Sequence, residues 1–323
     1  MSNNTRDKNK NQANPELGKA TNKKIRTESL LSLAVNAMSP GNIERMSVCG
    51  SFMSFMANSD FSKKKLASAN FCHNRFCPMC SWRQAKKDAL KIDVLMRYVE
   101  EVHKKAFIFI TLTVPNVNGN DLKNALDEFS NSFKRLIKLK EIKLVNKGYI
   151  RKLEITYNEE RNDFHPHYHI VMAVDKNYFT DKSYISRDKW LKFWQEATRD
   201  FSITQVDIRR IKRESAGKEQ NELAKYAAKD SDMVVSQDVF DVFYNCLKGR
   251  QVLTYNGLFT KANKMYKLKE LDSYKEIDST VYVYMILYQW GKGQYIETER
   301  RELLPSELSE LNRMLIDERE VDD

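Results

Sequence analysis

The chain has 323 residues and a formal net charge of +10, which allows a core of its own and more than one domain. The charge is uneven, because residues 297–323 carry ten acidic and four basic side chains, so this tail is −6 and the remainder is +16. A strongly basic body favours nucleic acid as a partner, with a merely soluble basic surface as the simpler alternative. No apolar run reaches the roughly 18 residues of a membrane span and no signal-peptide pattern is present, so we expect a cytoplasmic protein without a membrane partner.

The first segment, residues 1–28, is rich in Asn, Lys and Thr and has few large apolar side chains. Such a composition cannot bury enough apolar surface to offset the entropy lost on ordering. We therefore expect a flexible basic arm.

Residues 43–85 contain four of the five cysteines, namely Cys49, Cys72, Cys77 and Cys80. The spacing Cys77-Pro-Met-Cys80 is typical of a zinc knuckle, and the other two cysteines would complete a site of four thiolates. His73 is an alternative fourth ligand. Cysteines in a cytosolic chain favour metal or free thiols over disulfides. We expect a zinc-like lobe, and free buried cysteines are the simpler alternative.

Helix and strand patterns alternate over residues 86–235. Amphipathic spacing indicates helices, and β-branched or aromatic runs indicate strands. In chain order the expected elements are a helix at 86–104, a strand at 106–114, a helix at 121–139, a hairpin of strands at 149–157 and 164–174, a helix at 187–200, a strand at 203–211 and a helix at 218–230. This order predicts an α+β fold with a ferredoxin-like antiparallel sheet and helices packed on it.

The second hairpin strand holds three of the five histidines at alternate positions, His165, His167 and His169. Alternate side chains of a strand share one face, and two imidazoles on one face can bind a divalent cation. If the hairpin is centred on its polar loop, position i pairs with position 321 − i, and Glu154 lies opposite His167 on the same face. A carboxylate and two imidazoles form a metal site with open positions, with His165 as a fourth candidate. Ordinary surface histidines are the simpler alternative.

A helix-like segment follows, Glu222-Leu-Ala-Lys-Tyr226-Ala-Ala-Lys229. In a helix Glu222, Tyr226 and Lys229 lie on one face. A phenol has a pKa near 10 and needs a metal or a basic neighbour to act as a nucleophile on a phosphodiester. With fifteen tyrosines in the chain, a tyrosine that packs by its ring is the simpler alternative.

The combined pattern resembles the rolling-circle plasmid replication initiators of Gram-positive bacteria, which are HUH endonucleases with a single active tyrosine. The resemblance covers roughly residues 44–260 and depends on three motifs. These are Phe109-Ile-Thr-Leu-Thr-Val114, His165-Pro-His-Tyr-His169, and Glu222 to Asp232 with Tyr226 at its centre. The cysteine segment resembles the N-terminal part of the same family, and the tyrosine follows the histidine motif, as in these initiators.

The resemblance implies that Tyr226 nicks the plus strand at a plasmid's double-strand origin and stays attached to the 5′ end. Glu222 would activate water for the second cleavage at termination, and Lys229 would neutralise phosphate charge. The expected metal is Mg²⁺ or Mn²⁺ on His167, His169, Glu154 and His165, with structural zinc on the four cysteines. We expect DNA contacts from Arg75, Arg83, Lys86 and Lys225. The partners would be supercoiled or single-stranded hairpin origin DNA, a host helicase and a host polymerase, and a homodimer is allowed.

The predicted organisation is therefore a basic arm at 1–28, a cysteine-rich zinc-like lobe at 43–85, an HUH endonuclease domain at 86–235, and an α/β extension with an acidic tail at 236–323. Within the last segment we expect a strand at 281–290 and a charged helix at 303–318. Two alternative functions remain open: a single-tyrosine HUH transposase, and a non-catalytic zinc-dependent DNA-binding regulator whose histidines are structural.

Overall fold

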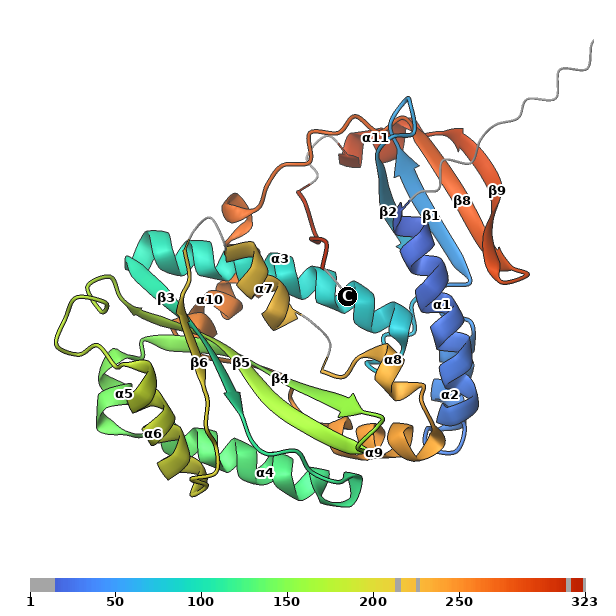
Figure 1. Ribbon diagram of the computed structural model, residues 1–323. Helices are drawn as coiled ribbons and strands as arrows, with labels where there is room; N and C mark the ends of the chain where they lie inside the picture. The colour runs from blue at the N-terminus through green and yellow to red at the C-terminus, as the bar shows by residue number, and fades with distance from the viewer. Residues whose placement is uncertain (1–14, 213–215, 225–226, 312–314, 322–323) are drawn as a thin grey trace, which may run out of the picture.

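The computed structural model describes residues 15–212, 216–224, 227–311 and 315–321. It is an α+β structure built on antiparallel sheets, as the sequence predicted. Figure 1 shows a large sheet with helices on both faces and a smaller sheet beside it.

The large sheet contains five strands in the spatial order β6-β3-β5-β4-β7, and every neighbouring pair is antiparallel. The strands are β3 (Lys105–Thr113), β4 (Gly148–Asn158), β5 (Asp163–Asp175), β6 (Asp207–Arg210) and β7 (Leu253–Gly257). From β3 to β6 the chain runs β-α-β-β-α-β, with α4 (Gly119–Leu136) and α6 (Arg187–Thr198) as the crossover helices and α5 (Lys140–Val145) as a short addition. The predicted strand at 203–211 is thus shorter, at Asp207–Arg210.

Helices α4, α6 and α9 (Gln237–Leu247) cover one face of this sheet (Figure 1). Their aromatic side chains pack on Tyr168, Ile170 and Met172 of β5, and the Phe129 ring stacks on Tyr168 with ring centroids 4.0 Å apart. This is the face away from the histidines, as strand alternation predicted. Because this face is packed with large aromatic rings, the helices on it fix the position of the β4–β5 hairpin.

Helices α3 (Pro78–His103), α7 (Ala216–Ala224) and α10 (Leu258–Lys267) cover the other face. They pack on Phe107 and Phe109 of β3 and on Val171 of β5. His167 and His169 have the same parity as Val171, so they lie beneath these helices rather than on an open surface.

The smaller sheet has four strands in the order β2-β1-β8-β9. They are β1 (Phe52–Ala57), β2 (Lys64–Ala69), β8 (Tyr284–Gly291) and β9 (Gln294–Glu302). The structure differs here from the predicted domain division. The cysteine-rich segment pairs with the C-terminal extension, while β7 of that extension joins the large sheet and α10 packs on it. Strand β1 is almost wholly buried, and its backbone groups are satisfied by partners on both sides, one of them distant in sequence.

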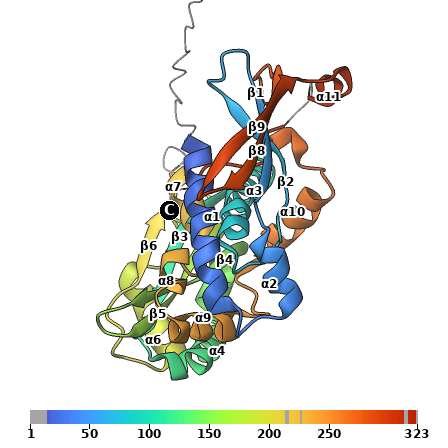
Figure 2. The ribbon, with the colours of Figure 1, turned by 90° about the vertical axis from the view of Figure 1, so that its right-hand side faces the viewer.

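The N-terminal segment also differs from its prediction. Residues 1–14 lie outside the described residues, but Pro15–Ala34 form helix α1, so the arm predicted for 1–28 is wrong from Pro15 onward. The lysines that suggested disorder are buried: the side chains of Lys23 and Lys24 are 2% and 1% exposed. Lys23 Nζ lies 2.9 Å from Asp230 Oδ2. Ion pairing thus adds to the anchoring that buried apolar side chains of α1, such as Leu30, provide. Figure 2 shows α1 running down the side of the molecule, next to α2 (Pro40–Ser47).

The C-terminal tail returns to the body of the protein. The predicted helix at 303–318 is shorter, with α11 at Pro305–Leu311, and Leu315 forms an isolated bridge with Ile277, beyond the 3-10 turn at Asp272–Tyr274. Arg319 N donates to the Lys86 carbonyl in α3 at 3.0 Å. Among the described residues, none of the helices is both long and apolar enough to cross a membrane.

The buried ion pairs of Asp230, which begins α8 (Asp230–Met233), generate the first prediction. We expect Asp230→Asn to destabilise the protein by about 3 kcal/mol, because it removes a buried partner of both Lys23 and Arg26. Glu128→Gln breaks an exposed pair with Arg135 and is the control, with a loss below about 1 kcal/mol. Urea unfolding of both variants measures the difference, and equal midpoints would contradict the anchoring role.

Candidate active site

The β4–β5 hairpin brings together the predicted metal ligands. Its register pairs Glu154 with His167 and Lys152 with His169, which confirms the predicted rule of 321 − i. Glu154 Oε2 lies 3.2 Å from His167 Nε2 and 3.0 Å from His169 Nε2. The donor atoms of the three residues, here called the triad, all lie within 4.8 Å of one another.

The ring nitrogens that face away from the triad have their own neighbours. His167 Nδ1 lies 3.3 Å from the His165 carbonyl oxygen, and His169 Nδ1 lies 3.4 Å from Thr111 Oγ1 in β3. Such contacts orient an imidazole so that its other nitrogen points at a metal. The His165 ring lies next to His167, with centroids 5.6 Å apart, but its nitrogens are not among the clustered donor atoms. His165 therefore lies beside the triad rather than in it.

The triad is electrostatically prepared for a cation. Burial would raise the pKa of Glu154, but hydrogen bonds with His167 and His169 outweigh it and hold the pKa of this carboxyl well below its usual range. Burial lowers the pKa of His165, and the neighbouring His167 acts in the same direction. A carboxylate with two imidazoles on one buried sheet face is a donor set that divalent cations accept, so the residues fit the expected metal.

The segment expected to carry the nucleophile borders the triad. Glu222 in α7 lies with Oε2 3.8 Å from His169 Nε2. After α7 the Ile155 N–H of β4 donates to the Ala227 carbonyl at 2.8 Å. Tyr226 and Lys225 themselves lie outside the described residues. Their sequence neighbours on both sides therefore contact the hairpin that holds the triad.

The predicted helix at 218–230 is wrong from Ala227 onward. Residues 227–229 are not helical, because the Ala227 carbonyl is engaged by β4 instead of by a residue one helical turn ahead. Lys229 is exposed and is the N-cap residue of α8. Glu222 and Lys229 consequently do not share the face of one helix.

The second cluster consists of the four predicted cysteines. Cys49 Sγ lies 3.5 Å from Cys80 Sγ and 3.6 Å from Cys77 Sγ, and Cys72 Sγ lies 3.6 Å from Cys80 Sγ. Four sulfurs held tetrahedrally at about 2.3 Å from zinc would be roughly 3.8 Å apart. The cluster has nearly that spacing, so its donor set fits zinc.

The surroundings of the cysteine cluster also suit thiolates. Cys77 is the N-cap residue of the long helix α3, whose dipole favours negative charge at this end. The His73 N–H donates to Cys80 Sγ at 3.2 Å, a contact that favours a negatively charged sulfur. His73 thus contacts the cluster through its backbone, and the clustered donor atoms come from the four cysteines. Cys246 is buried elsewhere.

The structure contradicts one predicted DNA contact and gives two others a structural partner. Lys86 is only 3% exposed and pairs with Glu318 and Glu320 of the tail, so its ammonium is not available to DNA. Arg83 pairs with Glu318, and Arg75 donates to the carbonyls of Leu247 and Arg250. The sequence could not reveal these pairings, because the partners are distant in the chain.

One basic residue close to the triad was not proposed as functional. Lys152 is buried, shares the face of Glu154 and pairs across the hairpin with His169. The predicted rule of 321 − i already places Lys152 opposite His169, so the register was the signal from which its position near the triad could have been predicted.

A regular antiparallel sheet with a Glu-His-His triad, beside four clustered cysteines, defines an α+β protein with two candidate metal centres. Residues 63–296 match the model of the family described as "Replication protein". The chain belongs to this family, and its resemblance to replication initiators of Gram-positive plasmids is confirmed.

Individual relatives agree with the family. A "Protein rep" of Staphylococcus aureus is 45% identical over 220 residues, which is 68% of this chain and 96% of the relative. A "Protein rep" of Bacillus amyloliquefaciens is 33% identical over 71% of this chain and 74% of the relative. One of Streptococcus pneumoniae serotype 2 is 33% identical over 72% and 74%. No solved structure matches the chain.

The cysteine cluster generates a prediction about zinc. We expect Cys77→Ser to lose bound zinc, because it removes one of four ligands that lie within 4.8 Å of one another. Cys246→Ser removes a buried cysteine outside the cluster and should keep the metal. Elemental analysis of the purified proteins measures both, and equal zinc contents would exclude a four-cysteine zinc site.

The triad generates a prediction about divalent cations. Glu154→Gln should weaken Mn²⁺ binding at least about tenfold, because it removes the only carboxylate among the clustered donor atoms. Glu160→Gln, in the exposed loop of the same hairpin, should bind Mn²⁺ like the wild type. Calorimetric titration with Mn²⁺ compares them, and an unchanged affinity in Glu154→Gln would show that the cation binds elsewhere.

Proposed function

We propose that this replication protein initiates plasmid replication by nicking one DNA strand at the origin, with Tyr226 as the nucleophile. The observation that carries the proposal is the approach of the Tyr226 segment to the triad from both sides. Glu222 reaches to 3.8 Å from His169, and the Ala227 carbonyl is hydrogen-bonded to β4 next to Glu154. A nucleophile and a phosphate-activating site must be adjacent for the chemistry to occur.

In the proposed reaction the Tyr226 phenol gives its proton to solvent and its oxygen bonds to phosphorus at the origin. The bond from phosphorus to the 3′ oxygen breaks, and this oxygen takes a proton from solvent, which leaves a 5′-phosphotyrosine and a free 3′-hydroxyl. A divalent cation, Mg²⁺ or Mn²⁺, held by Glu154, His167 and His169 would polarise the phosphate and stabilise its developing charge. His165, beside His167, would help to orient the triad.

Termination requires a second cleavage. Glu222 is partly exposed beside His169, so its carboxylate could accept a proton from water that attacks the second phosphodiester. Water would then replace a second tyrosine, and no second covalent adduct would remain. Lys229 follows the segment and would contribute positive charge toward the bound phosphates.

The topology supports this class of chemistry. The β-α-β-β-α-β order from β3 to β6, with the triad on the neighbouring strands β4 and β5, is the arrangement expected of a ferredoxin-like HUH endonuclease. The single-tyrosine transposase and the zinc-dependent regulator have no specific observation in their favour. Origin DNA, supercoiled or extruded as a hairpin, is the proposed substrate, and a host helicase and polymerase, with or without a homodimer, are proposed partners.

The test is covalent capture of labelled DNA. Wild-type protein with supercoiled plasmid that carries the cognate replicon and Mn²⁺ should yield nicked circles and a denaturation-resistant protein–DNA species. Tyr226→Phe should yield neither, because the phenyl ring has no oxygen to bond phosphorus. Tyr184→Phe, at an exposed tyrosine outside the site, should nick as the wild type does. Nicking by Tyr226→Phe at the wild-type rate would overturn the assignment of the nucleophile.

A further inference from the structure

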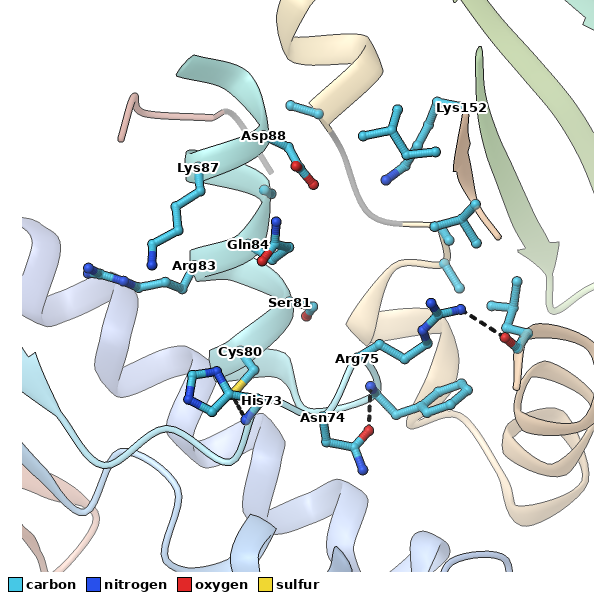
Figure 3. A pocket seen from close by; sticks show the side chains of 18 of the residues that line it. His73, Asn74, Arg75, Cys80, Ser81, Arg83, Gln84, Lys87, Asp88 and Lys152 are labelled. Atoms are coloured by element: carbon cyan, nitrogen blue, oxygen red, sulfur yellow. Dashed lines mark hydrogen bonds between the residues drawn. The ribbon is translucent and has the colours of Figure 1, made fainter. Parts of the chain in front are cut away.

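A cavity of about 560 Å³ lies between α3, residues 71–76 just before it, and strands β4 and β7. Its size falls in the range of small-molecule sites. Ala224, Ala227 and Ala228, which flank the Tyr226 segment, form part of its wall. Figure 3 shows Lys152, Asp88 and Arg75 arranged around this space.

The lining has more basic than acidic side chains, although Arg83 is also paired with Glu318 of the tail. Five basic side chains and one carboxylate, that of Asp88, contribute to it; the basic ones are Arg75, Arg83, Lys87, Lys91 and Lys152. A concave basic wall concentrates positive potential where an anionic group would bind. The ligand implied by this charge is an anion rather than an apolar molecule.

Lys152 is the residue that most requires a ligand. It is 5% exposed, and among the described residues its ammonium has no hydrogen bond and no ion pair within 4.0 Å. The carboxylates of Asp88 and Glu154 attract it only at longer range. A buried ammonium without a hydrogen-bonded counter-ion is costly, and an anion bound in the cavity would offset that cost. In Figure 3 the Lys152 side chain extends into the cavity.

Aromatic side chains add a second recognition element. Phe71, Phe76 and Tyr255 line the same cavity, and the Arg83 guanidinium lies over the Phe71 ring at 5.4 Å. The Tyr255 hydroxyl is buried and, within the described part of the chain, has no hydrogen-bond partner. Aromatic rings beside cations are the elements that bind single-stranded bases and their phosphates.

The cavity adjoins the triad. Lys152 and Glu154 are two residues apart on one strand face, which places them about 7 Å apart along β4. A strand whose scissile phosphate lay at the triad would therefore have a neighbouring nucleotide at the mouth of the cavity. Only a base that has left the stack can enter a pocket of this kind.

We propose that this cavity binds one unstacked nucleotide of the single-stranded DNA next to the cleavage point, with Lys152 on its phosphate and the aromatic wall against its base. This inference rests on the proposed nicking function. It adds a nucleotide-binding site on the side of the large sheet that α3 covers. Lys152 would be a positioning residue, because it holds the strand rather than attacks it.

The test measures how tightly full-length protein binds a fluorescent single strand of twelve nucleotides. Divalent metal is left out, so that the triad does not contribute. Lys152→Gln and Lys91→Gln should each weaken binding roughly tenfold or more. Lys192→Gln removes the same charge from an exposed position on α6, across the sheet, and should change affinity by less than about twofold. Wild-type affinity in both pocket variants would overturn the proposal, even if Lys152→Gln alone altered stability.

A second arm identifies the source of the nucleotide. An abasic site at the base that occupies the cavity should weaken wild-type binding, and the same site should matter little in Lys152→Gln. Free deoxynucleoside monophosphate should compete only at far higher concentration than the single strand. Competition at equal concentration would show a pocket for free nucleotides and overturn the DNA assignment.

These outcomes are independent of the nucleophile. Tyr226→Phe should still bind the single strand like the wild type while failing to nick plasmid. If Tyr226→Phe nicks normally, the proposed function fails whatever the pocket binds. If Lys152→Gln and Lys91→Gln bind normally while Tyr226→Phe is inactive, the pocket assignment fails alone.

Discussion

The pairing of β4 with β5 holds Glu154 opposite His167, and shifting it would disrupt the buried side chains on the other face of the sheet. A slip of one residue would turn the triad toward α4 and α6 and turn Tyr168 toward α3. Tyr168 resists this, since it is stacked on Phe129 and has the Arg151 guanidinium over its ring at 4.4 Å. The precision of the candidate metal site is therefore derived from aromatic packing that touches no metal ligand.

The helices on the opposite face, which bears the triad, explain why the site is enclosed. Helices α3, α7 and α10 cover the strands on the triad side, so the ligands are reached beside the helices rather than across an open sheet. Helix α3 begins at the cysteine cluster and passes over the large sheet, which links the two candidate metal centres through one rigid element. Loss of the cysteine cluster would thus also disturb the residues of α3 that line the cavity.

The sequence was most predictive where the chemistry is local. Period-two histidines and a polar hairpin loop were sufficient to place Glu154 opposite His167, and the cysteine spacing was sufficient to gather four sulfurs. The failures involve partners distant in the chain. The sequence suggested that Lys86 contacts DNA, but in the structure its ammonium pairs with Glu318 and Glu320. The sequence also placed Lys23 in a flexible arm, but in the structure it pairs with Asp230.

Helix periodicity failed for a related reason. The pattern of residues 218–230 is compatible with one helix, but the Ala227 carbonyl accepts a hydrogen bond from β4 and residues 227–229 are not helical. Local propensity could not anticipate this competition from a strand more than sixty residues earlier. Interrupting the helix brings the sequence neighbours of Tyr226 down to the sheet, which a continuous helix would not do.

The four-stranded sheet has a consequence for how the chain is made. Strand β1 emerges from the ribosome early, while its partner β8 is synthesised more than two hundred residues later. Until then one edge of β1 is exposed, and an exposed edge is a template for pairing with other chains. Closing so long a loop costs entropy that only the finished sheet repays. The large sheet can assemble first, so a protein cut short before β8 would keep the β4–β5 hairpin. The free edge of β1 would remain exposed in such a protein. Its yield in the cell would then be limited by aggregation rather than by loss of the triad.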